Sequence, residues 1–285
     1  MEKIIQIKID ELIFDCRKEG NEENALVILL HGWPETSHMW KKLMSSLAGK
    51  GYYCVAPNMR GYSENACPKG KKHYSLDKLV RDVIDISKFL NKPKFHLIGH
   101  DWGALIGWKL VHDHQDKILS WTGISVPHPQ AFGKAMMTNE EQIKMSQYVK
   151  NFQLPYLPEK GLRKDDFKIL RKLWKNCEPV EIDDYLKVFG NPNQLTASLN
   201  YYRSNYKLLK QAAKGQILGD INVPTLFIWG NKDIAVGSHS VNEGHGFMKK
   251  DYEFIELDSG HWLIQTAYTE LEKAISKHIV RNKLG

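Results

Sequence analysis

The chain has 285 residues, of which 42% are hydrophobic and 26% are charged. These proportions are typical of a globular protein and exclude a disordered, collagen-like or coiled-coil chain. The net charge of +7 comes from 40 basic and 33 acidic residues. Because the lysines are scattered, with small clusters only at 69–72 and 172–175, a solvated surface is favoured over a nucleic-acid or anionic-membrane partner.

Targeting and metal-binding signals are weak. No stretch approaches the roughly 20 apolar residues that span a membrane, and the first residues lack the pattern of a signal peptide. His112 and His114 have no evident third ligand, so we expect no metal and no cofactor. The spacing of the cysteines disfavours a disulfide framework and suits a reducing, cytoplasmic compartment. These cysteines are Cys16, Cys54, Cys67 and Cys177.

Apolar runs alternate with amphipathic stretches along most of the chain. Such alternation predicts an α/β protein with a mostly parallel sheet and helices on both sides. The predicted strands are 3–8, 11–16, 25–30, 52–56, 95–98, 118–125, 225–229 and 252–257. The predicted helices between and after them are 75–90, 104–112 and 263–280.

One long segment interrupts this alternation because it has helical periodicity and no convincing strand. Thr138 and Glu141 within it resemble a capping box, and Asn193 is expected to cap a later helix. We therefore predict an all-helical cap inserted between two strands of one sheet. The expected domains are a core of residues 1–128 and 219–285 and a cap of residues 129–218.

The motif Gly-His-Asp-Trp-Gly at 99–103 follows a predicted strand and opens a predicted helix. It has the form of a nucleophile elbow, with Asp101 in the place of the usual serine. The sharp turn of an elbow crowds the backbone, and Gly99 and Gly103 supply the small residues that it needs. An aspartate that only capped the helix would not require these glycines, so we interpret Asp101 as a nucleophile.

A second motif, His-Gly-Trp-Pro at 31–34, directly follows the predicted strand 25–30. In a hydrolase with an elbow, this loop contributes one backbone N–H to the oxyanion hole. The residue after the nucleophile contributes the other. We therefore expect the donors to be Trp33 and Trp102, although Gly-x-Pro alone is also compatible with an ordinary turn.

Two further residues follow predicted strands. Asp233 comes after 225–229, and His261 comes after 252–257. Ligands bind at the carboxyl ends of strands in open parallel sheets, where both residues are expected. Alone, each is compatible with a turn or a helix cap. Together with Asp101 they give the order nucleophile, acid and histidine, which indicates a catalytic triad.

With these motifs the sequence resembles the epoxide hydrolases of the α/β-hydrolase fold over about residues 10–280. The resemblance implies that two cap tyrosines hold the epoxide oxygen. Trp33 is a departure, since phenylalanine is commoner there, and its bulk is expected to reshape the pocket. The expected catalytic residues are Asp101, Asp233, His261, Tyr148 and Tyr202, the backbone donors are Trp33 and Trp102, and the substrate contacts are His31, Pro34 and Trp262.

The residue types suit that reaction. A carboxylate has a reference pKa of about 4, so Asp101 is ionised at neutral pH and can attack saturated carbon without losing a proton first. The resulting alkyl ester is hydrolysed by water that His261 activates. Asp233 orients the histidine and stabilises its cationic form. No cofactor is needed in this scheme.

The leaving group separates the alternatives. An epoxide opens to a basic alkoxide that needs a proton donor, whereas a halide needs none, so Tyr148 and Tyr202 favour a small-molecule epoxide as substrate. Buried tyrosines also serve simply as core residues. A haloalkane or haloacid dehalogenase of the same fold, in which Trp102 aids halide binding, is the main alternative. A non-catalytic receptor of the same fold is a further one, and both a monomer and a homodimer are compatible with the sequence.

Overall fold

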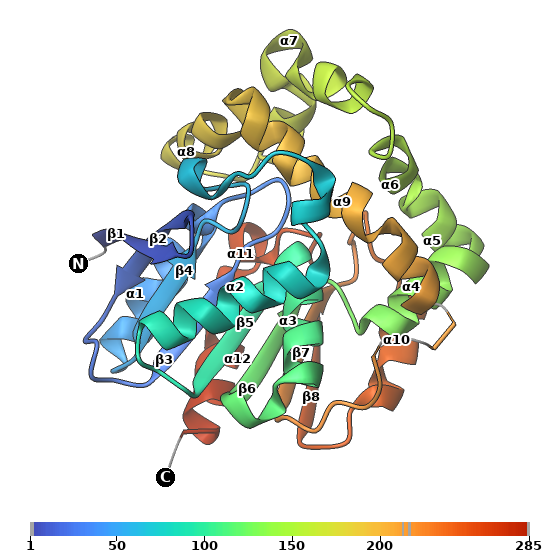
Figure 1. The fold of residues 1–285 in the computed structure, drawn as a ribbon. Helices are drawn as coiled ribbons and strands as arrows, with labels where there is room; N and C mark the ends of the chain where they lie inside the picture. The colour runs from blue at the N-terminus through green and yellow to red at the C-terminus, as the bar shows by residue number, and fades with distance from the viewer. Residues whose placement is uncertain (1–2, 213, 216–217, 284–285) are drawn as a thin grey trace.

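The computed structural model describes residues 3–212, 214–215 and 218–283. Eight strands form one sheet: β1 (Lys3–Ile9), β2 (Leu12–Glu19), β3 (Leu26–Leu30), β4 (Tyr53–Pro57), β5 (Phe95–His100), β6 (Ile118–Ile124), β7 (Thr225–Gly230) and β8 (Tyr252–Leu257). Their order is β1-β2-β4-β3-β5-β6-β7-β8 (Figure 1). Strand β2 pairs antiparallel with β1 and β4, and the strands from β4 to β8 pair in parallel. The mostly parallel sheet predicted from the sequence is confirmed.

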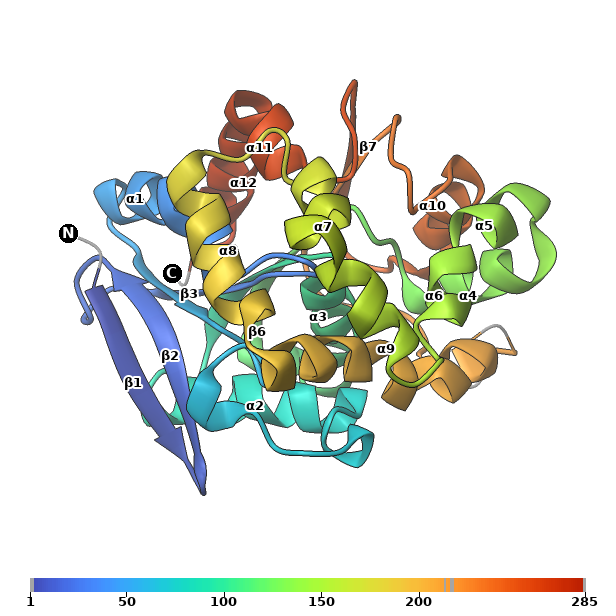
Figure 2. The same ribbon diagram turned by 90° about the horizontal axis from the view of Figure 1, so that it is seen from above.

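Helices cover both faces of the sheet. The core helices are α1 (Lys41–Gly49), α2 (Leu76–Phe89), α3 (Trp102–Asp113), α10 (Ser238–Gly244), α11 (Leu263–Thr266) and α12 (Tyr268–Arg281). Short 3₁₀ helices lie at Ser37–Trp40, Glu64–Ala66, Lys71–His73, Gln115–Lys117 and His245–Phe247. Helices α2 and α3 pack on one face of the sheet, and α1 and α12 pack on the other (Figure 2).

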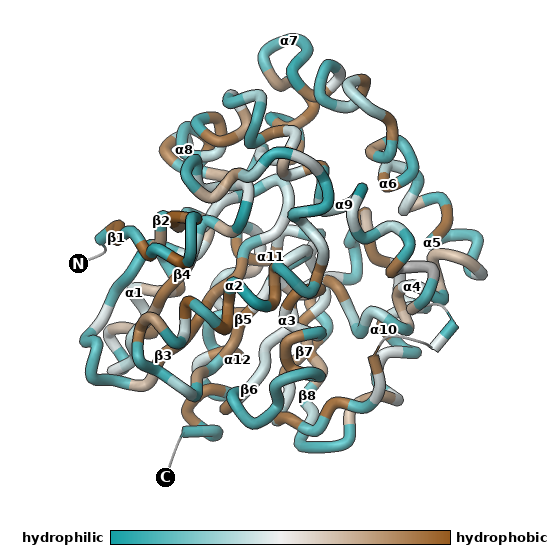
Figure 3. Tube along the Cα trace, viewed as in Figure 1, coloured by the Kyte–Doolittle hydropathy of each residue, from teal (hydrophilic) through white to brown (hydrophobic). Residues whose placement is uncertain are grey.

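Strand β3 illustrates why the sheet has two cores. All five of its residues are buried. Leu26, Ile28 and Leu30 belong to the cluster shared with α2 and α3, while Val27 and Leu29 belong to the cluster shared with α1 and α12. Since side chains alternate between the faces of a strand, a continuous apolar run is needed where both faces are covered. Figure 3 shows the same concentration of hydrophobic residues along the central strands.

In the described residues between β6 and β7 there are six helices. They are α4 (Pro129–Thr138), α5 (Glu140–Met145), α6 (Gln147–Asn151), α7 (Leu157–Leu173), α8 (Pro179–Gly190) and α9 (Pro192–Ala212). Helices α7, α8 and α9 cross over the sheet when the molecule is seen from above (Figure 2). We refer to these six helices as the cap helices. Every helix in the described part of the chain is too short or too polar to cross a bilayer.

Two predicted helix caps are wrong. Thr138 ends α4, and its hydroxyl donates to the carbonyl of Lys134 instead of capping the next helix. Asn139 caps α5, because its side chain accepts the N–H of Gln142. At the start of α9 the cap precedes a proline, and the side chain of Asn191 accepts the N–H of Asn193. Proline is favoured at the first position of a helix, so the helix begins earlier than expected.

Candidate active site

Asp101 occupies the turn between β5 and α3, with φ 52° and ψ −114°. A positive φ is unfavourable for a residue with a side chain, so the surroundings must hold the turn in place. A Cβ on Gly99 would lie 2.4 Å from the carbonyl oxygen of Gly103. A Cβ on Gly103 would lie 2.1 Å from the carbonyl oxygen of Leu30. Only glycine fits these two positions, as the elbow motif requires.

The structure brings the three residues of the predicted triad together. Nδ1 of His261 lies 2.8 Å from Oδ2 of Asp233, and Nε2 of His261 lies 3.5 Å from Oδ2 of Asp101. Asp233 follows β7 and His261 follows β8, so both lie beyond the carboxyl ends of their strands. All three residues are buried. The imidazole is thus held between two carboxylates.

A fourth polar side chain, Ser125, belongs to this cluster. Its hydroxyl donates to Oδ2 of Asp233 and lies 2.8 Å from Nδ1 of His261. Ser125 follows β6 with φ 73°, and β6 pairs directly with β7. Ser125 is not among the site residues predicted from the sequence. Its signal there is a hydroxyl at the carboxyl end of a predicted strand, where ligands bind in parallel sheets.

The charged groups of this cluster shift the pKa values of their neighbours. Burial raises the pKa of Asp233, but His261, Ser125 and the N–H of Ala235 lower it by more, so its net pKa is lowered. Burial alone would lower the pKa of His261, but the charges of Asp233 and Asp101 outweigh burial and raise this pKa to about 10. The resting site therefore holds an imidazolium between two carboxylates.

The predicted backbone donors lie beside Asp101. The N–H of Trp33 donates to Oδ1 of Asp101 at 2.7 Å. Trp102 is the first residue of α3, so its N–H has no acceptor within the helix. Both N–H groups are thus available to a negatively charged oxygen at the elbow.

Tyr148 of α6 and Tyr202 of α9 face the same carboxylate from the cap helices. Their ring centroids are 6.0 Å apart, and the ring of Tyr202 also packs 5.0 Å from that of Trp102. Burial, followed by the charge of Asp101, raises the pKa of both hydroxyls. Both phenols therefore keep their protons near neutral pH and can act as donors.

A cavity of about 470 Å³ joins these groups. Asp101, His261, Tyr148 and Tyr202 line it together with predominantly apolar side chains from the cap helices and the core. The apolar residues are Trp33, Phe152, Leu154, Leu157, Pro158, Leu162, Ile169, Leu173, Ile234, Ala235 and Trp262. A concave, apolar cavity with a few convergent polar groups is the usual form of a small-molecule site.

Of the three expected substrate contacts, Trp262 lines the cavity, whereas His31 and Pro34 are absent from its described lining. Substrate contact by these two residues therefore stays a prediction. His31 is fully buried, and its Nε2 accepts the N–H of Met59, so Nδ1 carries the proton and donates to the carbonyl of Gly32. The carbonyl of Pro34 accepts the indole N–H of a cap tryptophan. Both residues therefore stabilise the loop through hydrogen bonds to neighbouring segments.

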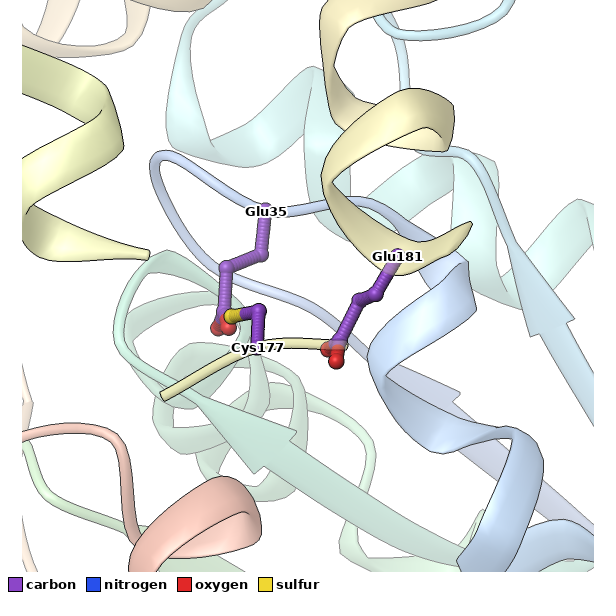
Figure 4. Close-up of side chains that lie close together, drawn as sticks. All are labelled: Glu35, Cys177 and Glu181. Atoms are coloured by element: carbon purple, nitrogen blue, oxygen red, sulfur yellow. The ribbon is translucent and has the colours of Figure 1, made fainter. Parts of the chain in front are cut away.

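A second polar cluster joins α8 to this loop (Figure 4). The amide of Gln265 donates to Oε1 of Glu35 at 2.7 Å and to Oε1 of Glu181 at 2.9 Å. The hydroxyl of Tyr185 lies 2.6 Å from Glu181 and 3.3 Å from Glu35. Each carboxylate thus accepts hydrogen bonds from the same two donors. We call this cluster the Glu35–Glu181 network.

The Glu35–Glu181 network reaches the backbone of the triad histidine. Oε2 of Glu35 lies 3.4 Å from Nδ1 of His100, and Nε2 of His100 lies 2.9 Å from the carbonyl oxygen of His261. A carbonyl can only accept, so Nε2 of His100 is the protonated nitrogen. The cap helix α8 is therefore linked through buried polar groups to the position of His261.

The same place has the ligand types of a metal site. One oxygen of Glu35, the thiol of Cys177 and one oxygen of Glu181 lie within 4.8 Å of one another (Figure 4). Burial raises the pKa of the Cys177 thiol and of Glu35, which disfavours the anionic forms that bind metals. Since Gln265 and Tyr185 already donate to the carboxylates, the observed arrangement suits a hydrogen-bonded network.

Comparisons with known proteins agree with this geometry. A family model described as the alpha/beta hydrolase fold matches residues 25–165. Human epoxide hydrolase 4 is 30% identical over 273 residues, covering 92% of this chain and 74% of that protein. Epoxide hydrolase 3 of Xenopus tropicalis is 29% identical over 283 residues, covering 95% and 76%. A crystal structure of Bacillus megaterium epoxide hydrolase with an inhibitor has a TM-score of 0.87 at 24% identity, covering 96% of this chain and 99% of that chain.

The strand order and the elbow define an α/β hydrolase with a carboxylate at the elbow position. Sequence identity to the curated relatives narrows this class, and the chain belongs to the epoxide hydrolase family. The family resemblance and the fold that were predicted from the sequence motifs are both confirmed.

Proposed function

We propose that this chain hydrolyses an epoxide to a vicinal diol through a covalent ester on Asp101. One carboxylate oxygen attacks a ring carbon, and the carbon–oxygen bond of the ring breaks with its electron pair on oxygen. The N–H of Trp33, which donates to Oδ1 of Asp101 at 2.7 Å, holds the carboxylate in one orientation. Holding the nucleophile in place lowers the entropic cost of attack.

Tyr148 and Tyr202 supply the proton that the opening ring needs. Both line the cavity with Asp101, and both keep their protons because burial raises the pKa of their hydroxyls. Both hydroxyls donate hydrogen bonds to the ring oxygen, and one of them transfers its proton to the developing alkoxide. This pair of phenols opposite a buried carboxylate is the observation that carries the proposal.

Hydrolysis of the ester then depends on His261. Ester formation removes the negative charge of Asp101, which is one of the two charges that raise the pKa of His261. Ester formation therefore lowers the pKa of His261. We propose that the imidazolium then returns a proton to the phenolate left by ring opening, so that the neutral Nε2 can activate water. Asp233 stabilises the imidazolium that forms again. The oxyanion of this step is stabilised by the N–H groups of Trp33 and Trp102.

The domain arrangement supports this division of roles. We propose that residues 1–128 and 219–285 form the core, which carries the triad, and that residues 129–218 form the cap. The cap helices bring Tyr148 and Tyr202 to the cavity, which supports a substrate site between cap and core. The thiols of the four cysteines are free, which supports our assignment of a reducing, cytoplasmic compartment.

A matched substrate panel tests the proposal. The wild-type chain and Asp101→Ala are assayed with an apolar epoxide, a haloalkane and a carboxylic ester of similar size, and diol, halide and acid are measured. We expect diol from the epoxide alone, and none from the folded Asp101→Ala variant. Halide or acid release at comparable rates, or diol formation by the variant, would contradict the proposal.

Tyr202→Phe is expected to slow diol formation by roughly 100-fold or more, as loss of a positioned proton donor does.

A further inference from the structure

The mouth of the cavity is surrounded by exposed apolar side chains. Large hydrophobic side chains that are about half exposed or more rarely gather in one place on a protein surface. Here five side chains from the loop before α7, from α7 itself and from the loop after β7 are 48–84% exposed. We call them the apolar rim: Leu154, Tyr156, Leu157, Ile169 and Ile234. All but Tyr156 also line the cavity, so the rim and the cavity mouth coincide.

The same part of the chain is strongly basic. Residues 154–175 contain seven lysines and arginines but only three acidic residues. Arg171 is paired with Asp166. Lys168 and Lys172 are exposed and form no ion pair with any residue in the described part of the chain. We call residues 154–175 the basic segment.

The position of α7 makes both features accessible. Figure 1 shows α7 at the outermost part of the cap, on the side away from the sheet. Hydrophobic and hydrophilic residues alternate along this helix (Figure 3). Its buried side chains, Leu162 and Leu170, pack inward, while Leu157 and Ile169 remain exposed. The helix thus presents apolar and basic side chains to the surroundings together.

We propose that the apolar rim and the basic segment dock the protein on the surface of an anionic lipid bilayer. Helices that lie in such an interface combine lysines and arginines with exposed apolar side chains, as α7 does. Each basic residue near an anionic bilayer strengthens binding, and the apolar side chains enter the region of the headgroups and acyl chains. Docking on this surface would place the cavity mouth against the lipid.

Charge complementarity favours a bilayer over a second copy of this chain. A symmetric contact through the rim would bring the two basic segments close together, and like charges destabilise such an interface. An anionic bilayer instead offers negative charge to Lys168 and Lys172 and an apolar phase to Tyr156 and Leu157. A peripheral contact of this kind requires no membrane-spanning helix.

Docking also has a consequence for the substrate, which rests on the proposed function. Apolar epoxides partition into bilayers, because transfer of apolar surface out of water is favourable. An epoxide dissolved in the lipid could enter the cavity at the rim without crossing water. The substrates of the docked enzyme are thus lipid-dissolved epoxides.

Vesicle sedimentation tests docking without any need for turnover. The Asp101→Asn chain is mixed at low ionic strength with vesicles of phosphatidylcholine alone or of equal parts phosphatidylcholine and phosphatidylserine. We expect binding to the mixed vesicles that weakens with salt. Since each basic side chain contributes roughly fivefold in affinity, Lys168→Gln with Lys172→Gln should weaken binding roughly 30-fold. Because this chain lacks the nucleophile, the result does not depend on the proposed function.

Matched variants separate docking from general effects of charge and folding. Lys273→Gln with Lys277→Gln removes two exposed charges at the same spacing from α12 and should leave binding unchanged. Tyr156→Asn removes the most exposed rim side chain at a residue with φ 60°, a conformation that asparagine tolerates well. Tyr156→Asn should weaken binding, whereas Phe89→Asn, at an exposed position of α2, should not.

Three outcomes would overturn the proposal. The first is equal binding to vesicles with and without phosphatidylserine, or no binding to either. The second is an equal loss of binding in the α7 and α12 double variants. The third is dimerisation of the protein that Tyr156→Asn abolishes in the absence of vesicle binding, which would assign the rim to a second copy.

Discussion

At the scale of single residues, the site is organised around one imidazolium and two carboxylates. Asp101 accepts one hydrogen bond from the backbone and faces His261, while Asp233 accepts from Ser125 and from two backbone N–H groups. The unequal number of donors distinguishes the two acids. These donors help to lower the pKa of Asp233, whereas Asp101 lines the cavity and can bond to carbon.

Replacement of His261 should separate the two chemical steps. In His261→Gln the epoxide can still alkylate Asp101, but no base activates water, so the ester should persist. Intact-protein mass spectrometry after incubation with an epoxide should show the mass of the protein plus one substrate. Asp101→Ala is the matched control and should show no such adduct. An unmodified His261→Gln protein would contradict the assigned order of steps.

The raised pKa of His261 also predicts a pH dependence of stability. The pKa rises from 6.5 to about 10 on folding, so the folded state binds more protons between these values. The stabilisation is complete below the unfolded pKa and is lost as the pH rises toward 10. The free energy of unfolding measured with urea should therefore fall by a few kcal/mol across this range.

The variant Asp101→Asn provides the control for this effect. It removes one of the two carboxylates that raise the pKa of His261 while keeping the size of the side chain. The remaining charged or titratable groups near the ring are Asp233, His100 and Glu35. The decline in stability with pH should be smaller in Asp101→Asn than in wild type. Identical declines would show that His261 is not the group responsible.

The proximity of the three predicted triad residues could be expected from the sequence, because they follow strands in a fixed order that the sequence displays directly. Ser125 was missed because a single serine after a strand has no motif around it. The surroundings of His31 could not be predicted from the sequence, because neighbours in sequence need not face the same cavity. Its ring packs under the loop and accepts the N–H of Met59, a contact between segments 28 residues apart.

At the scale of elements, the Glu35–Glu181 network connects the cap to the core. One amide, Gln265 of α11, donates to a carboxylate from the core loop and to another from α8. Without this amide, the hydroxyl of Tyr185 would be the remaining donor between the two acids in this network. The position of α8 over the core is thus set by polar contacts as well as by apolar packing.

Replacement of Gln265 should therefore destabilise the protein. In Gln265→Leu the buried Glu35 loses its shortest hydrogen bond and keeps only the longer one from Tyr185. Weakening the hydrogen bonding of a buried acceptor in this way should cost about 1–3 kcal/mol. Urea unfolding should register this loss. Gln115→Leu, at an exposed glutamine, is the matched control and should change stability by less than about 0.5 kcal/mol. Equal stabilities of the two variants would contradict a structural role for the network.

The boundaries of helices were less predictable than their existence. The predicted helix 263–280 is two helices, α11 and α12, separated at Ala267 with φ −142°. Helix α7 contains a bend at 164–167, where the backbone leaves the helical region. The break at Ala267 has no proline or glycine to mark it, so the periodic pattern of 263–280 alone missed it. In the bend of α7, Asp165 and Asp166 adopt positive φ, which aspartate tolerates better than most residues.

At the scale of the whole molecule, the cavity selects substrates by polarity. The only ionisable side chains in its described lining, apart from the two tyrosines, are Asp101 and His261, and neither can pair with an anionic substrate without disturbing the triad. A substrate carboxylate would therefore be buried without a partner, which is costly. The structure favours uncharged epoxides with apolar substituents.

A pair of substrates checks this selectivity. An epoxide whose aliphatic chain ends in a methyl ester should be hydrolysed with a kcat/KM at least about tenfold higher than the free acid, equivalent to roughly 1.4 kcal/mol. Ile169→Lys adds a cation at the cavity mouth and should narrow this difference. Preference of the wild-type chain for the free acid would contradict the inferred selectivity.

The inserted cap leaves the sheet after β6 and returns before β7, which are neighbouring strands. Ser125, directly after β6, donates a hydrogen bond to Asp233, which follows β7. The side chain of Asp233 is thus held in place by a residue of the neighbouring strand end. Chimeric proteins that exchange residues 129–218 for the equivalent segment of a homologue should keep the hydrogen bond between Ser125 and Asp233. Exchange of this segment should therefore change the selectivity for substrates without changing the type of reaction.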